Sequence, residues 1–190
     1  VIHLAAIVGD AACALDEEAA VQTNWTATIA FARRAKARGV RRFVFASTCS
    51  VYGEGRDEML TEESPAKPLS LYAETRWHAE LGILELVDGQ GFEPVILRFG
   101  TIYGLSPRMR FDLVVNFLAQ KAVREGTVSI FGGSQWRPFV HVSDIARGII
   151  LGVHEPLPVG APPIMNVGDN LENYQLRDVK EELEKHVPGV

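Results

Sequence analysis

Residues 42–53 read Arg42-Phe43-Val44-Phe45-Ala46-Ser47-Thr48-Cys49-Ser50-Val51-Tyr52-Gly53. The apolar run at the start of this stretch predicts a strand over Arg42–Ala46. Small hydroxyl side chains follow at once, so the strand ends in groups that can donate and accept hydrogen bonds. A short hydroxyl there can hydrogen-bond a reacting oxygen and fix the geometry that proton transfer requires. We therefore select Thr48 as a candidate catalytic group.

Outward from this stretch, short apolar runs alternate with longer helical patterns, which is typical of a parallel α/β sheet. We expect strands at Val1–Ile7, Arg42–Ala46, Pro94–Phe99, Thr127–Phe131 and Ile164–Val167. We expect helices near Asp16–Arg38, Leu69–Val87, Phe111–Arg124, Val142–Val153 and Gln175–His186. The first helix should bury one face, formed by Val21, Trp25, Ile29 and Ala32. The basic run Arg33–Arg38, followed by Gly39, indicates where that helix ends.

Tyr72 and Arg76 are four residues apart in the second predicted helix, so they share one of its faces. A phenol has a pKa of about 10 and is a poor base at neutral pH, but a cation held beside it favours the phenolate. Such a pair is also a common surface contact, because aromatic and cationic side chains stack on many helices. The surrounding sequence decides between the two interpretations.

Several segments resemble, in the right order, those of the extended short-chain dehydrogenase/reductase family. Its members include the NAD-dependent epimerases and dehydratases that act on nucleotide sugars. Val1–Ala6 is similar to the family's strand under the cofactor, and Asn24 falls where its next helix carries an asparagine. Thr48 falls on the family's Ser or Thr, and Tyr72 on its tyrosine. Two later segments match as well, Leu97–Gly104 after the catalytic helix and Arg137–Asp144 in the R-x-(F/Y)-(I/V)-H-V-x-D pattern.

The resemblance implies a partial Rossmann-like, doubly wound parallel α/β sheet with a small C-terminal substrate-binding part. Residues 1–100 correspond to the C-terminal portion of the dinucleotide-binding domain, and residues 101–190 to the substrate-binding part and remaining sheet elements. The implied cofactor is NAD, with NADP not excluded, and the implied substrate is a nucleotide sugar. The helices near residues 16–38 and 69–87 correspond to those that form the family's homodimer contact.

The resemblance also implies roles for individual residues. The catalytic set is Thr48, Tyr72 and Arg76. The cofactor-binding set is Leu4, Ala5, Ala6, Asn24, Ser47, Tyr72, Arg76 and Phe99. The substrate-binding set is Thr48, Thr101 and Arg137. Arg137 can grip a diphosphate with its planar fork, and Thr101 replaces an asparagine that contacts substrate in many members.

Three departures from the family pattern bear on function. The cation after the tyrosine is Arg76 where the family has lysine, and a guanidinium cannot present a point charge to a ribose diol. Cys49 and Ser50 stand where sugar 4,6-dehydratases carry an Asp-Glu pair, which favours epimerase or oxidoreductase chemistry over loss of water. No Gly-rich turn of G-x-G-x-x-G spacing precedes a helix, so we expect a fragment that lacks the first βαβ units.

Composition excludes several other classes of function. The 190 residues are 47% hydrophobic and carry a net charge of −5, which gives no electrostatic reason to expect nucleic acid or an anionic membrane as partner. No apolar run approaches about 18 residues, so we expect no transmembrane helix. Cys13 and Cys49 lack C-x-x-C spacing and fit structural thiols in a reducing, cytoplasmic setting. His3 and His141 lack partners at metal-ligand spacing, so we expect structural histidines and no metal.

Three hypotheses remain open at this point. The first is a nucleotide-sugar epimerase in which Tyr72, assisted by Thr48, removes a hydroxyl proton as hydride leaves the same carbon. The second is a reductase or dehydrogenase that releases the ketone, and stoichiometric use of NAD(P)H would distinguish it. The third is a non-catalytic binding or assembly module, which Arg76 and the absent Gly-rich turn both favour.

Overall fold

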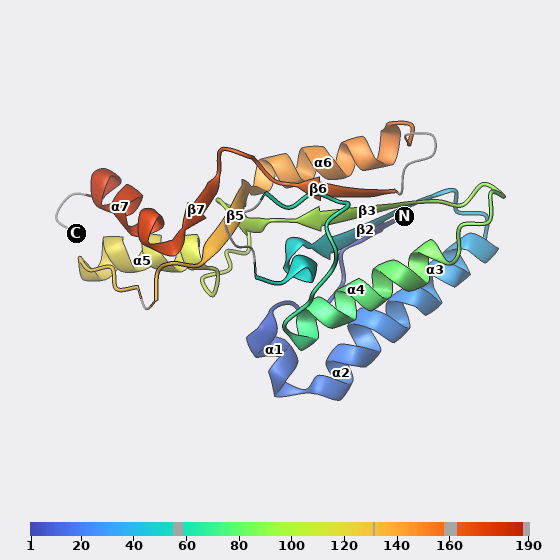
Figure 1. Ribbon diagram of the computed structural model, residues 1–190, viewed down its shortest axis with the longest axis horizontal. Helices are drawn as coiled ribbons and strands as arrows, with labels where there is room; N and C mark the ends of the chain where they lie inside the picture. Colours follow the sequence, from blue (N-terminus) through green and yellow to red (C-terminus); the bar gives the residue numbers. More distant parts are fainter. Residues whose placement is uncertain (55–58, 131, 158–162, 188–190) are drawn as a thin grey trace. The chain divides into compact units, whose positions relative to one another are not determined.

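The computed structural model describes residues 1–54, 59–130, 132–157 and 163–187 (Figure 1). The chain divides into two compact units, each with its own core. Unit 1 contains Val1–Glu54, Met59–Phe99 and Arg147–Asn166, and unit 2 contains Gly100–Ala146 and Val167–Val190. The chain therefore leaves unit 1 after Phe99 and returns to it for residues 147–166.

Unit 1 is built on a four-stranded sheet with the order β1-β2-β3-β6. The strands are β1 (Ile2–His3), β2 (Arg42–Thr48), β3 (Glu93–Phe99) and β6 (Ile164–Val167). β2 is parallel to both β1 and β3, and the register pairs Thr48 with Phe99. The expected parallel α/β fold is confirmed, as are the strands that we expected to begin at Arg42, Pro94 and Ile164, within two residues at each end. The strand expected at Val1–Ile7 is shorter in the structure, where β1 covers only Ile2–His3.

Helices cover both faces of this sheet (Figure 1). One face packs on α3 (Ala27–Ala37) and α4 (Leu71–Leu84), with Phe43, Phe45 and Ile96 of the sheet buried against Ala32, Ala79 and Ile83. The other face packs on α6 (Val142–His154), where a Cβ added at Gly152 would contact Val44, Val95 and Leu97. Successive strand residues point to opposite faces, so an apolar run such as β2 supplies both layers.

The helix expected over Asp16–Arg38 is present but not uniform. It consists of α2 (Glu17–Val21), a π-helical turn η1 (Gln22–Thr26) and α3, and a further helix, α1 (Asp10–Leu15), precedes it. Asp16 caps α2 by accepting a hydrogen bond from the Ala19 N–H at 2.9 Å. Gly39, with φ of 77°, follows the basic last turn of α3, as the sequence indicated.

The buried face of this helix differs from the one expected. The residues with at most 6% exposure are Ala20, Asn24, Thr28, Ala32 and Ala35, whereas Val21, Trp25 and Ile29 are only half-buried. The π turn is the physical reason, because it adds a residue to one turn and rotates the face that meets the sheet. Two polar residues thereby enter the interior, and both find hydrogen-bond partners.

Unit 2 holds a three-stranded sheet with the order β4-β5-β7. Its strands are β4 (Thr101–Tyr103), β5 (Trp136–His141) and β7 (Asn173–Gln175), with β4 parallel and β7 antiparallel to β5. Two helices, α5 (Val114–Glu125) and α7 (Leu176–His186), pack over it around Leu118, Phe139 and Val179. Both helices were expected at these positions, but none of the three short strands was.

The strand expected at Thr127–Phe131 is wrong for residues 127–130, which form no strand, while Phe131 lies outside the described residues. Val128 is only 7% exposed and packs with Leu118, Phe139 and Val179. The apolar character of this segment therefore reflects side-chain packing under α5 and α7, not pairing in a sheet. No helix in the part of the chain that the structure describes is long and apolar enough to cross a membrane.

Candidate functional site

Thr48 is the last residue of β2 and lies next to Phe99, the last residue of β3. Its hydroxyl accepts a hydrogen bond from the Ser50 N–H and donates one to Ser50 Oγ, both at 3.1 Å. Thr48 thereby caps the short 3₁₀ helix η2 (Cys49–Tyr52). The side chain is 9% exposed. The sequence-predicted hydroxyl is thus fixed at the carboxyl end of a parallel strand, where ligands of open α/β sheets bind.

Tyr72 and Arg76 lie on α4, which begins after the cap residue Ser70. Tyr72 is half-buried and Arg76 is 1% exposed. The guanidinium lies over the Phe45 ring, 4.3 Å from its centroid, and Nη2 donates to the carbonyl oxygen of Ala46 in β2. Burial lowers the pKa of Arg76, while Tyr72 and Glu80 act in the opposite sense by favouring the charged form. Tyr72 and Arg76 thus interact electrostatically on α4, and the Arg76 guanidinium ties this helix to β2.

Two donor atoms of Arg76, Nε and Nη1, are buried and have no hydrogen-bond partner among the described residues. An unsatisfied buried donor costs about 1–3 kcal/mol, and more for a charged group. A buried cation with two unused donors therefore has the character of a binding group rather than of a structural one.

The segment after β1 contains the predicted cofactor residues Leu4, Ala5 and Ala6, of which Leu4 is 54% exposed. Asn24 holds this segment from the π turn of the neighbouring helix. Its Oδ1 accepts from the Ile7 N–H and its Nδ2 donates to the Ile7 carbonyl, both at 2.8 Å. Both amide atoms of Asn24 are thus used and its side chain has no exposure, so Asn24 fixes the backbone of Ile7.

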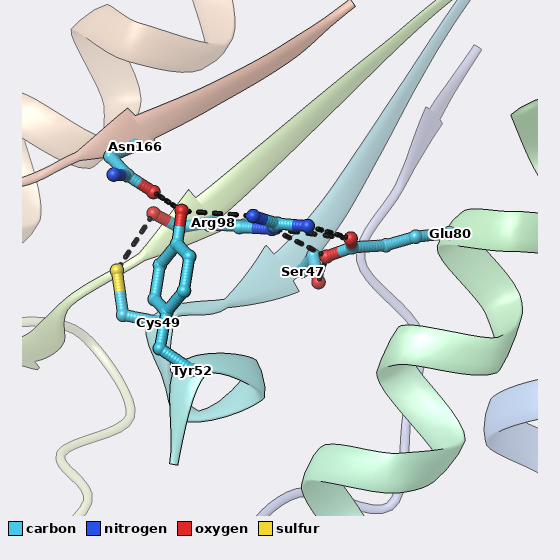
Figure 2. Close-up of polar contacts among 6 residues, drawn as sticks. All are labelled: Ser47, Cys49, Tyr52, Glu80, Arg98 and Asn166. Carbon is cyan, nitrogen blue, oxygen red and sulfur yellow. Dashed lines mark hydrogen bonds and ion pairs between the residues drawn. The ribbon is translucent and has the colours of Figure 1, made fainter. Parts of the chain in front are cut away.

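A buried polar network behind Thr48 was not anticipated from the sequence (Figure 2). Glu80 of α4 and Arg98 of β3 form a doubly hydrogen-bonded ion pair, with Nη2 to Oε2 at 2.6 Å. Ser47, one of the predicted cofactor residues, donates its hydroxyl to Glu80 Oε1. Burial opposes the charge on Arg98, but the carboxylate of Glu80 outweighs it and raises the Arg98 pKa. A charged residue inside the apolar run Val95–Phe99 was the available signal, because a buried arginine requires a buried acid.

Two histidines have structural surroundings. His3 Nε2 lies 3.1 Å from Thr28 Oγ1, and its ring stacks on Phe45 at 6.0 Å. Burial and the nearby charge of Arg76 lower the pKa of His3. His141 Nδ1 lies 2.7 Å from Ser143 Oγ in unit 2. Among the residues described, no group of three or more His, Cys, Asp or Glu side chains could hold a metal ion.

The predicted substrate residues Thr101 and Arg137 both lie in unit 2. Thr101 begins β4 and pairs with Phe139 of β5. Arg137 lies on β5, is exposed, and donates from Nη1 to the neighbouring Trp136 carbonyl at 3.0 Å. The planar fork of Arg137 therefore remains at the surface of its sheet.

The family model described as "NAD dependent epimerase/dehydratase family" matches residues 1–168. The chain belongs to this family. The matched residues include the segment of Leu4 in unit 1 and the segment of Arg137 in unit 2.

Among curated relatives, the UDP-glucuronate 4-epimerase of Thermodesulfobacterium geofontis is 32% identical over 97% of this chain and 56% of its own length. An uncharacterized UDP-glucose epimerase, YtcB of Bacillus subtilis, is 36% identical over 68% of this chain and 40% of its own length. The chain thus spans about half the length of these relatives.

Solved structures of the family agree. MoeE5 in complex with UDP-glucose and NAD has a TM-score of 0.84 and 30% identity, covering 98% of this chain and 61% of that one. The UDP-glucuronic acid 4-epimerase of Bacillus cereus, in complex with UDP-glucuronic acid and NAD, has a TM-score of 0.82 and 29% identity, covering 97% and 58%. A dehydratase is also similar: the dTDP-D-glucose 4,6-dehydratase of Mus musculus is 29% identical over 75% of this chain and 39% of its own length. The similar proteins thus include both epimerases and dehydratases, and their names do not fix one reaction for this chain.

Proposed function

We propose that this chain is part of an NAD(P)-dependent epimerase that acts on a nucleotide-diphosphate sugar through transient oxidation to a ketone. The observation that carries the proposal is the arrangement of Thr48, Tyr72 and Arg76, with α4 tied to the end of β2 by the Arg76 hydrogen bond to Ala46. The names of the relatives support a UDP-sugar as the first substrate class to test.

The residues present fit a dinucleotide cofactor. The unused Nε and Nη1 donors of Arg76 match oxygen acceptors such as ribose hydroxyls, although their fork differs from the ammonium of the family's lysine. Leu4, Ala5 and Phe99 would pack against the nicotinamide ribose, and Tyr72 would lie beside it. Bound NAD supplies the hydride acceptor and, in the return step, the hydride donor.

The chain's own groups move the proton. Tyr72 Oη, on the same helix as the cationic Arg76, accepts the proton of the sugar hydroxyl and returns it when the ketone is reduced. The Thr48 hydroxyl can rotate its hydrogen from Ser50 Oγ to the same substrate oxygen while it still accepts from the Ser50 N–H. Rotation of the ketone within the pocket would present its other face to the cofactor, and reduction on that face gives the epimer.

Cys49 supports epimerisation over dehydration. Loss of water needs an acid and a base beside the catalytic hydroxyl. Burial raises the pKa of Cys49 to about 12, and its Sγ donates to the Arg98 carbonyl at 3.3 Å. The thiol is therefore neither a base nor a useful acid at neutral pH.

We propose that this protein forms a homodimer. The surface of α2–α4 carries a stacked Trp25–His78 pair, with ring centroids 4.4 Å apart, and an exposed Leu81. Apolar and aromatic side chains on adjacent helices are typical of an interface core. The same surface would serve the alternative assembly module if Arg76 does not permit turnover.

The experiment that tests the function is incubation of the NAD-bound protein, as its gene encodes it, with UDP-glucuronate, UDP-glucose, dTDP-glucose and a GDP-sugar. We expect epimer formation without net use of cofactor. Stoichiometric oxidation of NAD(P)H would instead support the reductase hypothesis, and no NAD binding would favour the assembly module.

Tyr72→Phe is the matched variant for this test, because it removes only the phenolic oxygen. We expect turnover to fall by roughly 10²- to 10⁴-fold, since the base is lost, while NAD binding persists. Undiminished epimerisation by Tyr72→Phe contradicts the role assigned to Tyr72.

A further inference from the structure

The ion pair between Glu80 and Arg98 is almost entirely buried, with exposures of 1% and 5%. Arg98 Nε lies 3.1 Å from each carboxylate oxygen, and Nη2 adds a third contact. Burying such a pair is rarely a net gain in stability, because desolvation of two charges can exceed their attraction. Stability alone therefore does not explain why unit 1 keeps this pair.

The contacts of the pair converge on the segment that carries Thr48 (Figure 2). Ser47, the residue before Thr48, donates to Glu80. Tyr52, at the end of η2, accepts from Arg98 Nη1 at 2.9 Å, and its ring lies 4.8 Å from the guanidinium. The pair thus holds residues 47–52 at both ends, with Thr48 between them.

Two further hydrogen bonds fix this segment to β6 and β3. Tyr52 Oη donates to Asn166 Oδ1 of β6 at 2.7 Å, and the Cys49 thiol donates to the Arg98 carbonyl. Glu80 lies two helical turns after Tyr72 on α4, on the face that carries Arg76. A shift of α4 along its axis would therefore break contacts of Glu80 with β2 and β3.

We propose that Glu80 and Arg98 are positioning residues that set the placement of the Thr48 hydroxyl relative to Tyr72. The inference rests on the proposed function, because it assigns the pair a part in the same proton transfer. Neither side chain touches the reacting oxygen. They act through Ser47, Tyr52 and α4, and their loss should lower the rate of chemistry more than the affinity for substrate.

The test compares two variants with the NAD-bound wild-type protein. Glu80→Gln keeps the shape of the side chain and removes its charge, and the double variant Glu80→Met/Arg98→Met removes the whole pair. We expect kcat to fall roughly 10- to 100-fold, as for small misplacements of reacting groups, with KM for the sugar nucleotide little changed. We also expect faster amide hydrogen exchange over residues 47–52.

The control is Lys36→Met/Asp88→Asn, which removes an exposed ion pair of the same unit and should change neither kcat nor exchange over residues 47–52. Folded Glu80 and Arg98 variants with wild-type kcat, or with unchanged exchange, overturn the inference. If the double variant does not fold, kcat and exchange of the Glu80→Gln variant test the inference. Failure of both to fold also overturns it, since the pair would then serve the fold as a whole.

The exchange measurement separates this inference from the proposed function. A wild-type protein that epimerises no nucleotide sugar contradicts the function. Exchange over residues 47–52 still reports whether the pair holds the Thr48 segment.

Discussion

Arg76 places a positive charge in the interior of unit 1, beside the phenol that it is proposed to activate. Its guanidinium is held by the Phe45 ring and the Ala46 carbonyl, so its charge is fixed in place. A fixed cation favours the phenolate as well as lysine does, but its fork fits a vicinal diol less well. We therefore expect Arg76 to affect the rate of the proposed reaction rather than its kind.

Replacement of Arg76 by lysine is expected to raise kcat by about tenfold, equivalent to about 1.4 kcal/mol in the activation barrier. Arg76→Met keeps the length of the side chain without its charge. It should move the rising limb of the pH–rate profile to higher pH, because the phenolate is then no longer favoured by a cation. Steady-state rates of both variants across pH test this, and equal rates for lysine and methionine count against a role for the charge.

The sequence led us to select Thr48, Tyr72 and Arg76, because their positions match segments of the family in the right order, and this selection stays a prediction. The sequence was not sufficient to show how they are held. The Glu80–Arg98 pair escaped detection because a buried ion pair depends on where two elements meet, not on local spacing. The amide of Asn24 was likewise selected as a cofactor contact, whereas the structure shows it bonded to the backbone of Ile7.

At the scale of elements, long apolar runs and amphipathic helices were predictable, whereas short strands were not. β5 contains Pro138, which donates no hydrogen bond, and its exposed first residues hide its apolar part. β4 and β7 have three residues each, too few for a period to be recognised. The π turn in the first long helix contains Asn24, which is hydrogen-bonded to Ile7, and local periodicity does not reveal such a contact between separate segments.

The π turn leads to a prediction for Asn24→Asp. The aspartate could still accept from the Ile7 N–H but could not donate to the Ile7 carbonyl, which would keep only the Cys13 thiol as a donor, and it would place a carboxylate at a fully buried position. We expect a loss of about 1–3 kcal/mol in the free energy of unfolding, together with weaker NAD binding by the loosened Leu4–Ala6 segment.

Chemical denaturation and calorimetric titration with NAD measure the two effects. The matched control is Asn173→Asp, which makes the same change at an exposed position in unit 2. Unchanged NAD affinity in a destabilised Asn24→Asp protein would show that the segment is not part of the cofactor site.

At the scale of the whole molecule, each of the two units has a separate core. The predicted residues Thr48, Tyr72 and Arg76 lie in unit 1, and the predicted residues Thr101 and Arg137 lie in unit 2. Fold class and the order of the long elements followed from the sequence. The return of residues 147–166 to unit 1 did not, because it depends on packing between distant segments, such as Gly152 on Val95.

The proposed homodimer gives a prediction at this scale. Leu81 of α4 is 41% exposed, so Leu81→Arg should leave the core intact and place a charge in the interface. We expect the wild-type protein to sediment as a dimer and this variant as a monomer, with unchanged circular dichroism. Leu171→Arg, at a position that is 84% exposed in unit 2, is the control and should remain dimeric. A monomeric wild-type protein would rule out this interface.

The thiol of Cys49 has a consequence for how the protein responds to oxidants. Only the thiolate reacts with peroxides and alkylating agents, and burial raises the pKa of Cys49 to about 12, so its thiol stays protonated at neutral pH. The residue next to the catalytic hydroxyl therefore stays chemically silent. We therefore expect oxidants to leave the Cys49 thiol unmodified in the folded protein.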